Sequence, residues 1–434
     1  MKAVVLAAGQ GVRLWPLTEN RPKHMIPIGG RPIISYVIES LRRNEITNII
    51  VVVGYKKESI QNYLGNGGDF SLHVEYLVQP RVAGTADAVR LAEGRVGNQP
   101  FMVLNGDQLI SFNSVEKVLA VHKTYPYDHV MGLVPVDRPE NYGVVSVEES
   151  RVKSILEKPH ARGLLGDLVN AGIYVFQTEI FSAIRRTRKS KRNEFEITDS
   201  LKSLIQLGSV RAALIDRNSW IDIGRPWDLL EANERILKKC EHRIDGVIEE
   251  GARIVPPVII SKDARVHAGS VLIGPVFVGE GTELGPNCRI RSCTSIGKRV
   301  KIGPSCDIKN SIIMDDTKVP HLTYIGDSVI GEKCNFGAGT NVANLRLDDA
   351  TVETRIRGRV VNSGRLKFGI ITGDNVRTGI NASLMPGVKI GSGSWIGPAV
   401  ILEKDVQADS LVLVAQKLVQ RKKRNVKQKV HCRP

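Results

Sequence analysis

The sequence predicts an α/β protein in which a doubly wound α/β domain is followed by a left-handed parallel β-helix. Over roughly the first 240 residues, short apolar runs alternate with helical patterns. That alternation is typical of a mostly parallel sheet covered by helices on both faces. After residue 241, aliphatic residues recur every six positions, a period that matches a β-helix with three short strands in each coil.

The length and the charge of the chain limit its possible domain organisation. Its 434 residues exceed one ordinary core, so we expect one domain over residues 1–240, a second over 241–415 and a basic, disordered tail over 416–434. The tail holds eight of the basic residues behind the net charge of +16 and no acidic residue. Nucleic acid is therefore not expected as a partner, although RNA contact through the tail stays open. The remaining excess of positive charge suits a protein with anionic substrates.

No apolar run approaches the roughly 20 residues that span a bilayer, so no membrane partner is expected. The first residues enter an apolar strand without a signal-peptide pattern, from which we expect a cytoplasmic protein. The six cysteines form no C-x-x-C pair, so we expect reduced thiols and no zinc site.

The N-terminal domain is expected to begin with a buried strand and to alternate from there. Ligands of doubly wound sheets lie beyond the carboxyl ends of the strands, where polar residues follow the apolar runs of this chain. The predicted strands are Ala3–Ala7, Ile49–Val53, His73–Leu77, Phe101–Leu104, His129–Val134 and Gly172–Phe176. The predicted helices are Ile33–Arg43, Lys57–Leu64, Ala86–Glu93, Ser114–Tyr125, Glu179–Arg188, Ile197–Gln206 and Asp228–Cys240.

The segment from Leu6 to Ile28 organises this domain. Gly9 and Gly11 let the backbone turn sharply, and the N–H groups of such a turn suit a phosphate. Arg13 and Lys23 add two cations, although glycines alone would favour a solvated surface loop. The full string LAAGQGVRLWPLTENRPKHM is far more specific. It resembles the signature G-x-G-x-R-L-x-P-L-T-x-x-R-P-K-x-M of the sugar-1-phosphate nucleotidylyltransferases.

This resemblance implies a Rossmann-like nucleotidyltransferase domain that uses UTP or dTTP and a sugar-1-phosphate. The sugar phosphate would attack the α-phosphorus in line and release pyrophosphate, so the protein has to align two anions and neutralise charge. The signature points to Arg13 and Lys23 as catalytic residues. The implied nucleotide-binding residues are Leu6, Ala8, Gly9, Gly11, Gln79, Gly84 and Thr85. Without the resemblance, Thr85 would be interpreted as an ordinary helix N-cap.

Two carboxylates follow predicted strands. Asp107 comes after the apolar run FMVL and an Asn-Gly pair, and Asp222 lies in the stretch WIDIG. By itself, Asp107 fits a solvated turn equally well. Mg²⁺ usually binds one or two carboxylates together with substrate phosphate oxygens. The family uses an Asp of each motif as a metal ligand, so the resemblance implies Mg²⁺ held by Asp107 and Asp222.

The family's sugar pocket uses a glycine N–H, a Glu and an Asn for the hydroxyls, and a Lys that faces the sugar phosphate. A plain salt bridge between Glu157 and Lys158 is the alternative. The stretch Glu196–Asp199 is interpreted as a helix start capped by Thr198 or Asp199. The implied sugar-binding residues are Tyr142, Gly143, Glu157, Lys158 and Asn170.

The C-terminal repeat has eleven aliphatic residues in phase, from Ile248 to Ile308. Cys288 and Cys306 lie eighteen residues apart, or three hexads, which places them in adjacent coils. Stacked strands sit about 4.8 Å apart, which is long for a disulfide, so we expect a reduced ladder. The rhythm breaks near Met314 and again over Ala343–Leu366, and both breaks are predicted to be loops that leave the stack.

The first break carries the string HLTYIGD. It resembles the acetyltransferase domain of the bifunctional glucosamine-1-phosphate acetyltransferase / N-acetylglucosamine-1-phosphate uridylyltransferases, whose His is the general base when the sugar amine attacks acetyl-CoA. His321 takes that place here. The implied acceptor-site residues are Arg291, Lys309, Tyr324, Asn335 and Asn344. With the first domain, the whole chain resembles the archaeal bifunctional enzymes, for which a homotrimer is the norm.

Two departures from that family leave alternatives open. Leu345 stands where the family usually has Tyr, and residues 345–353 contain no Lys. They favour a protein with nucleotidyl transfer alone, whose β-helix serves trimerisation or regulation, while His321 and its companions argue against this. A third hypothesis, a non-catalytic assembly or RNA-associated protein, is opposed by the intact signature and carboxylates.

Overall fold

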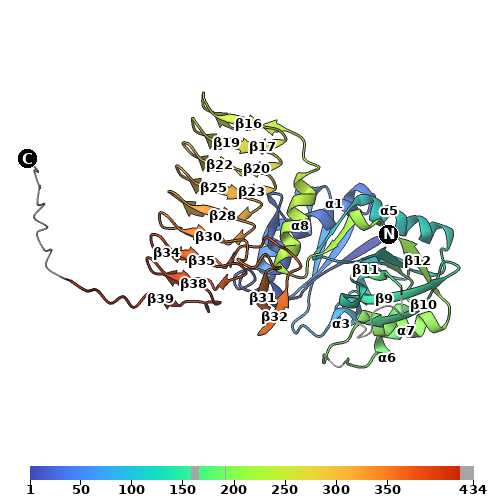
Figure 1. Ribbon diagram of the computed structural model, residues 1–434. Helices are drawn as coiled ribbons and strands as arrows, with labels where there is room; N and C mark the ends of the chain where they lie inside the picture. Colours follow the sequence, from blue (N-terminus) through green and yellow to red (C-terminus); the bar gives the residue numbers. More distant parts are fainter. Residues whose placement is uncertain (158–165, 191, 421–434) are drawn as a thin grey trace, which may run out of the picture.

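The computed structural model describes residues 1–157, 166–190 and 192–420. An N-terminal α/β body lies beside a column of short strands (Figure 1). The body is built on a nine-stranded sheet of order β5-β4-β1-β6-β11-β8-β12-β10-β9, as far as the described residues show. Its strands are β1 (Lys2–Ala7), β4 (Asn48–Val53), β5 (His73–Val78), β6 (Phe101–Asn105), β8 (His129–Pro135), β9 (Gly143–Glu148), β10 (Arg151–Glu157), β11 (Leu168–Phe176) and β12 (Val210–Leu214).

Helices cover both faces of this sheet, and two small strand pairs flank it. The pairs are β2 (Pro27–Ile28) with β3 (Arg31–Pro32), and β7 (Gln108–Ile110) with β13 (Trp220–Asp222). The helices are α1 (Ile33–Arg43), α2 (Lys57–Leu64), α3 (Thr85–Arg90), α4 (Glu93–Val96), α5 (Phe112–Thr124), α6 (Ile180–Arg186), α7 (Ile197–Gln206) and α8 (Pro226–Leu237).

All six predicted strands of the body are present, but the sheet is mixed rather than mostly parallel. The strands β5, β4, β1 and β6 run parallel, whereas β11 is antiparallel to both β6 and β8. The prediction missed the hairpin of β9 and β10. Its two turn residues, Glu149 and Ser150, have φ of +48° and +63°, a turn that usually carries Asn-Gly. Because Glu-Ser carries no such signal, the hairpin was not recognisable from its turn.

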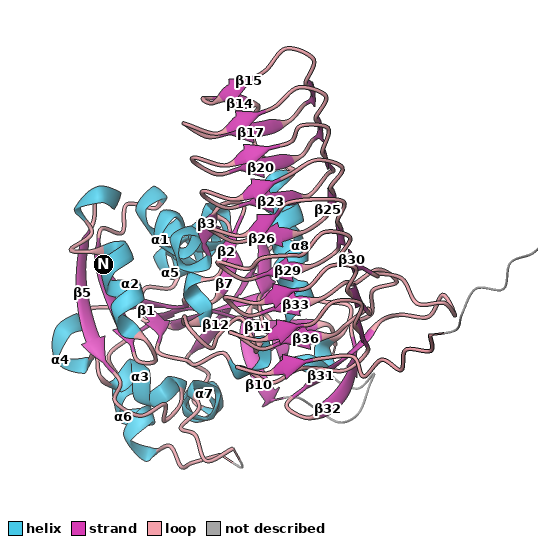
Figure 2. Cartoon of the chain, turned by 90° about the vertical axis from the view of Figure 1, so that its left-hand side faces the viewer, coloured by secondary structure: helices cyan, strands magenta, loops and turns pink. Residues whose placement is uncertain are grey.

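The second body is a parallel β-helix, as the six-residue period predicted. Three strands form each coil, and Figure 2 shows one face of the stack. The first face holds β14 (Arg243–Ile244), β17 (Val258–Ile260), β20 (Val276–Val278), β23 (Thr294–Ile296), β26 (Ile312–Ile313), β29 (Val329–Ile330), β33 (Ile371–Thr372) and β36 (Lys389–Ile390). The second holds β16 (Arg253–Val255), β19 (Val271–Ile273), β22 (Arg289–Ile290), β25 (Asp307–Lys309), β28 (Tyr324–Gly326), β30 (Asn341–Val342), β35 (Ser383–Leu384) and β38 (Ile401–Leu402). The third holds β15 (Val247–Ile248), β18 (Arg265–Val266), β21 (Glu283–Leu284), β24 (Lys301–Ile302), β27 (Lys318–Val319), β34 (Arg377–Thr378), β37 (Trp395–Ile396) and β39 (Leu411–Val412).

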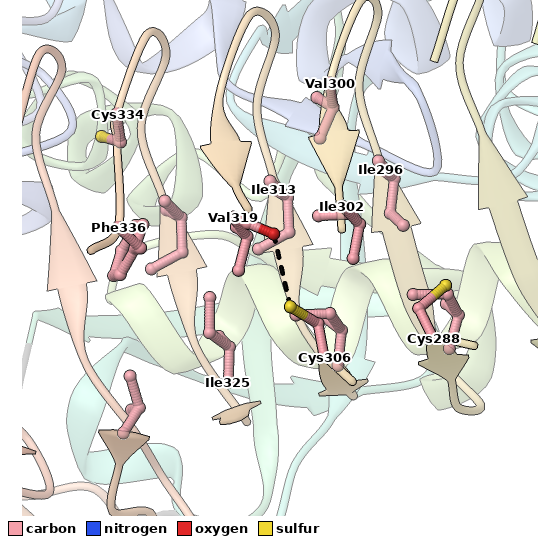
Figure 3. Close-up of a cluster of buried hydrophobic side chains, with 14 of the residues drawn as sticks. Cys288, Ile296, Val300, Ile302, Cys306, Ile313, Val319, Ile325, Cys334 and Phe336 are labelled. Carbon is pink, nitrogen blue, oxygen red and sulfur yellow. Dashed lines mark hydrogen bonds between the residues drawn. The ribbon is translucent and has the colours of Figure 1, made fainter. Parts of the chain in front are cut away.

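The interior of the column is filled by stacked aliphatic side chains and thiols (Figure 3). Cys288 and Cys306 are free and buried, which confirms the predicted reduced ladder. The Cys306 thiol donates to the Val319 carbonyl oxygen at 3.3 Å. Burial raises the pKa of Cys288 to about 11, so this thiol stays protonated and acts as a small apolar side chain.

The first break in the repeat is not a loop, contrary to the prediction. Ser295 pairs with Ile312 and Ile312 with Val329, so each coil there is one residue shorter than the 18-residue step from Arg289 to Asp307. Deleting one residue at a corner shifts the phase of the hexads but leaves the stack intact. For that reason, the six-residue period could not be followed in the sequence past this point.

The second break does leave the stack. Asn341 of β30 pairs with Ser383 of β35, and the excursion between them includes a hairpin of β31 (Glu353–Ile356) and β32 (Arg359–Asn362). This hairpin lies at the foot of the column on the side of the α/β body (Figure 1).

The two bodies share one apolar cluster. Helix α8 lies between them (Figure 1), and the Trp227 ring meets the Phe368 ring edge-on with centroids 6.0 Å apart. From the first body the cluster includes Leu14, Leu17, Ile26, Leu229 and Leu230. From the second it includes Ile312, Met314, Val329, Val352, Ile356 and Ile371. The signature segment is therefore packed directly against the β-helix.

A buried ion pair crosses the same interface. Arg21 Nη2 lies 2.9 Å from both carboxylate oxygens of Asp374 and 2.9 Å from Glu332 Oε1. The Arg21 and Asp374 side chains are almost fully buried. Nearby, Glu19 Oε2 accepts the Ser392 N–H at 2.7 Å. These contacts hold residues of the signature segment in one position relative to the column.

We predict that Arg21→Ala destabilises the protein strongly, because it leaves Asp374 as an unpaired buried charge. The expected loss is roughly 3–5 kcal/mol of unfolding free energy, measured by denaturant unfolding. Arg31→Ala is the control: it removes the half-exposed Arg31–Glu39 pair and is expected to cost at most about 1 kcal/mol. Equal unfolding midpoints for the two variants would contradict the prediction.

Candidate functional site

The glycine-rich turn after β1 is built around Lys23. Gly11 has a φ of +71°, and a Cβ on it would lie 2.8 Å from the Cβ of Lys23. Only glycine allows this conformation and this approach together. Around Gly9, by contrast, a Cβ would meet nothing within 4 Å. The turn is therefore closed on the Lys23 side and open above Gly9, where a ligand could approach the backbone.

A cavity of about 360 Å³ lies beside this turn at the carboxyl ends of β1 and β6. It contains Arg13 and Lys23 together with residues from several distant segments, among them the acidic Glu194. Its lining includes Gly9, Gly11, Arg13, Lys23, His24, Asp107, Gly224 and Arg357. Arg357 belongs to the turn between β31 and β32 of the second body.

Lys23 and Asp107 form an ion pair within the cavity, with Lys23 Nζ 2.7 Å from Asp107 Oδ2. Burial alone would raise the pKa of the Asp107 carboxyl, but Lys23 and Arg13 hold it below its usual value. Arg13 lies against Gly224, where a Cβ would be 3.2 Å from its Nη1. The structure thus brings Arg13, Lys23 and Asp107 together and keeps the carboxylate ionised.

His24 is a cavity residue that the sequence analysis missed. It is buried, and its Nδ1 has no hydrogen-bond partner among the described residues. Burial lowers the pKa of His24 to about 4, so the ring is neutral near pH 7. Its place directly after Lys23 was visible in the sequence, but its burial beside a ligand cavity was not.

Asp222 lies next to this cavity rather than in its lining. In the β7–β13 pair it stands opposite Gln108, the residue after Asp107. Burial and the charge of Asp222 raise the pKa of Asp228 to about 7. Asp228 Oδ2 accepts the N–H groups of Gly224 and Arg225 at 2.9 and 2.7 Å. Across the described part of the chain, no group of three or more His, Cys, Asp or Glu side chains could hold a metal by itself.

The predicted nucleotide-binding loop is clamped onto the segment before α7. Thr85 Oγ1 accepts the Ile197 N–H at 2.9 Å, so the prediction that Thr198 or Asp199 caps α7 was wrong. Gly84 has a φ of +113°, and a Cβ on it would lie 2.3 Å from the Phe195 carbonyl oxygen. The Thr85 hydroxyl serves α7 and not its own helix.

Other predicted nucleotide-binding residues are held by the fold. The Gln79 side-chain amide donates to the Gly84 carbonyl oxygen at 3.1 Å and to Asp87 Oδ2 at 2.9 Å. Leu6 and Ala8 bury their side chains in the core. Their carbonyl oxygens accept the N–H groups of Gly106 and Tyr55, at 2.9 and 3.3 Å. These two residues can contact a ligand through the backbone and not through buried side chains.

Three of the predicted sugar-binding residues gather on β9, β10 and β11. Gly143 pairs with Glu157, whose Oε2 would lie 3.0 Å from a Cβ on the glycine. Glu157 Oε1 accepts from Arg192 Nη2 at 3.3 Å, a partner that the sequence analysis did not anticipate. The Asn170 side-chain amide donates to the Tyr174 hydroxyl at 2.6 Å.

Two further predicted sugar-binding residues stand apart from these three. The Tyr142 ring packs edge-on against Trp220, with centroids 5.8 Å apart. Lys158 lies outside the described residues.

On the second face of the β-helix, three of the predicted acceptor-site residues gather around Asp327, a buried residue that was not predicted. Lys309 Nζ lies 3.3 Å from Asp327 Oδ2, and the Asn344 amide donates to the same oxygen. Asn344 also donates to the Tyr324 hydroxyl at 3.2 Å. Arg291 lies one coil away, 3.5 Å from Asp307 Oδ2. We call Arg291, Lys309, Tyr324, Asp327 and Asn344 the Asp327 cluster.

Two predicted acetyl-transfer residues lie outside the Asp327 cluster. His321 is exposed at the corner before β28, where its carbonyl oxygen accepts the Thr323 hydroxyl at 2.8 Å. Asn335 is on the third face, where its backbone forms parallel β-bridges with Lys318 and with Arg377. One copy of the chain therefore does not bring all six predicted residues into contact.

The missing lysine of residues 345–353 has a spatial counterpart. Leu345 pairs antiparallel with Lys367, an exposed residue on the return path of the excursion. A lysine thus lies beside Leu345 in space, although residues 345–353 contain none.

Comparison with known proteins shows the family to which the chain belongs. The Nucleotidyl transferase family model matches residues 2–239, and the GMPPB C-terminal domain model matches residues 272–385. "Bifunctional protein GlmU" of Methanococcus maripaludis strain C7 is 48% identical, and the alignment covers 98% of this chain and 100% of that protein. The "Bifunctional sugar-1-phosphate nucleotidylyltransferase/acetyltransferase" of Sulfurisphaera tokodaii is 37% identical over 94% and 98%. The chain belongs to this bifunctional family.

One solved structure is similar in fold to the first body of this chain. A putative glucose-1-phosphate thymidylyltransferase from Bacillus anthracis, in complex with a sucrose, aligns with a TM-score of 0.50 and 30% sequence identity. It covers 54% of this chain and 94% of its own. As for membranes, the described residues include no helix with the length and apolar character to cross one.

The two glycines of the turn are predicted to respond differently to alanine. Gly9→Ala has room in the free protein and should leave the unfolding temperature unchanged, yet weaken UTP or dTTP binding at least about tenfold by occupying the ligand's space. Gly11→Ala should instead destabilise the fold by roughly 1–2 kcal/mol, because its Cβ meets Lys23.

Calorimetric nucleotide binding and thermal unfolding measure both effects. Gly94→Ala is the matched control, since a Cβ there also meets nothing within 4 Å and the residue lies in α4, away from the cavity. Nucleotide binding by Gly9→Ala equal to that of Gly94→Ala would contradict the prediction.

Proposed function

We propose that the chain carries two transferase sites. The first transfers a nucleotidyl group from UTP or dTTP to N-acetylglucosamine-1-phosphate or glucose-1-phosphate. The second transfers an acetyl group from acetyl-CoA to the amine of glucosamine-1-phosphate. The first proposal rests above all on the Lys23–Asp107 pair beside the open backbone at Gly9. The relatives' printed names support both activities.

At the first site, a phosphate oxygen of the sugar-1-phosphate attacks the α-phosphorus, and pyrophosphate leaves from the opposite side. Arg13, Lys23 and the turn amides neutralise the charge and hold the phosphates in line. The side chains of Glu157 and Asn170 bind and orient the sugar hydroxyls, together with the Gly143 N–H. No covalent intermediate with the protein is needed.

The donor set fits a hard divalent cation. Asp107 is held ionised in the cavity, Asp222 lies on the paired strand, and both offer carboxylate oxygens. In this proposal the two residues hold Mg²⁺ together with phosphate oxygens of the substrates, and the ion supplies charge neutralisation of the triphosphate.

At the second site, Arg291 and Lys309 bind the sugar phosphate, while Tyr324 and Asn344 hold the sugar. His321 removes a proton from the amine as its nitrogen attacks the thioester carbonyl, and coenzyme A leaves as the thiol. Because His321 and Asn335 do not reach the Asp327 cluster within one chain, we infer a homotrimer in which neighbouring columns complete the site. Exposed Leu322, Leu345 and Leu347 support such a contact.

The alternative function is nucleotidyl transfer alone, with the β-helix as a trimerisation or regulatory module. Leu345 favours it, and the cation of Lys367 opposite Leu345 weakens it. The cytoplasmic location stays a prediction from the sequence. The tail is described only as far as residue 420, so its predicted disorder falls largely outside the described residues.

The acetyl-transfer proposal is tested by thiol release from acetyl-CoA with glucosamine-1-phosphate or galactosamine-1-phosphate. His321→Ala should lower this rate at least about 100-fold, because it removes the general base. His73→Ala, which replaces an exposed histidine of the first body, should leave the rate unchanged. No thiol release by a wild type that is active with UTP or dTTP would leave a single-function enzyme.

The independence of the sites is tested by Asp107→Asn. This variant should lose nucleotidyl transfer at least about 100-fold, measured as pyrophosphate release, because the proposed metal loses a carboxylate ligand. Thiol release should stay within about twofold of wild type, since the Asp327 cluster lies on a different body. Loss of both activities, with an unchanged unfolding temperature, would show that the sites are coupled.

A further inference from the structure

The β31–β32 hairpin is held firmly against the α/β body. The side chains of Ile356 in β31 and of Val352, directly before β31, join the apolar cluster that includes Leu14 of the signature segment. Thr354 Oγ1 donates to the Gly387 carbonyl oxygen at 2.6 Å, and the Lys389 ammonium donates to the Arg355 carbonyl oxygen. These contacts fix the tip of the hairpin relative to the glycine-rich turn.

The tip consists of Arg357 and Gly358, with φ of +51° and +77°. Positive φ at both central residues is the geometry of a type I′ turn, which prefers Asn-Gly. An Arg in the left-handed region is disfavoured relative to residues that adopt it readily. The chain thus has a long cation at a position where local turn chemistry favours asparagine.

Arg357 lines the cavity that contains Lys23 and Asp107. It also lines a second cavity of about 820 Å³ on the other side of Gln10 and Val12. Arg355 and Lys404 line this second cavity as well. Cations therefore continue from the first cavity outwards past the glycine-rich turn.

The side chains of Arg355, Arg357 and Lys404 are exposed. Within the described parts of the chain, none of Arg355, Arg357 and Lys404 takes part in an ion pair. The acidic groups of the second cavity are engaged elsewhere: Asp405 lies 3.7 Å from Lys389 Nζ, and Glu19 accepts the Trp15 and Ser392 N–H groups. The exposed cations are thus available to an anionic ligand.

The direction of the reaction indicates which anion this is. In the sheet, β4 lies on one side of β1, and β6 and β11 lie on the other. The proposed sugar-binding residues are on the β11 side, whereas Arg357 shares a cavity with Tyr55, which follows β4. Because an in-line displacement puts the entering and leaving oxygens on opposite sides of phosphorus, the leaving group departs towards Arg357.

We propose that Arg357 binds the β- and γ-phosphates of the nucleoside triphosphate and the pyrophosphate that leaves, so that the second body completes the first active site. As the α-phosphorus–oxygen bond breaks, its electron pair passes to the pyrophosphate, and the guanidinium neutralises that charge with two parallel N–H donors. This proposal rests on the proposed nucleotidyl transfer and adds a binding residue from the other domain.

Arg357→Asn tests the proposal without damaging the hairpin, since asparagine suits the turn. Its KM for pyrophosphate in the reverse reaction and for UTP or dTTP should rise at least about tenfold. KM for the sugar-1-phosphate should stay within about twofold. Arg357→Lys, which keeps the charge but not the fork, should recover part of the loss.

Arg359→Asn is the matched control, because Arg359 is an exposed cation two residues away in β32 and lies outside both cavity linings. It should resemble wild type in every measurement. Thermal unfolding and thiol release from acetyl-CoA report whether the variants are folded. Calorimetric titration with pyrophosphate measures binding without turnover, and Arg357→Asn should lower that affinity at least about tenfold.

Two results would overturn the proposal: unchanged pyrophosphate binding by Arg357→Asn, or an equal loss in Arg359→Asn. Absence of turnover in the wild type with either nucleotide would instead count against the proposed nucleotidyl transfer. Pyrophosphate titration of the wild type and Arg357→Asn would still decide the role of Arg357 in that case, so the two failures are distinguishable.

Discussion

The geometry of the first site depends on the buried ion pair between Arg21 and the Asp374–Glu332 carboxylates. Arg21 lies two residues before Lys23, so the segment that presents Lys23 is tied to the β-helix and not only to its own sheet. A buried charge is tolerated only when its partner is in place, and small displacements of either body are therefore costly. The pair ties the relative position of the bodies to the position of the signature segment.

The glycines around the first site differ in what surrounds them. Gly11 is required because Lys23 approaches the turn too closely for a side chain, and Gly224 similarly leaves room for Arg13. Gly9 has no such neighbour and leaves its backbone open. Packing within the protein accounts for the first two glycines but not for Gly9. Within the signature, Gly11 thus meets a packing requirement that Gly9 does not.

In the β-helix, the loss of one residue from a coil coincides with the Asp327 cluster. The shortened corners are those that carry Asn310 and Asp327, with φ of +43° and +51°. The tighter corners bring Lys309, Asn310 and Asn344 onto one carboxylate. A small change in the repeat thus turns an otherwise uniform column into a polar site.

The sequence by itself determined the strands around β1, most helices, the six-residue period and the polar residues after each strand, because burial at a fixed spacing is a local property. It did not reveal the Glu149-Ser150 turn, since that turn lacks the usual residues. Only the tertiary structure decided that Asp222 stands beside the cavity and that Lys367 faces Leu345. Likewise, Arg357 reaches a site more than three hundred residues earlier in the chain, and such contacts follow from how two bodies pack, which no local pattern encodes.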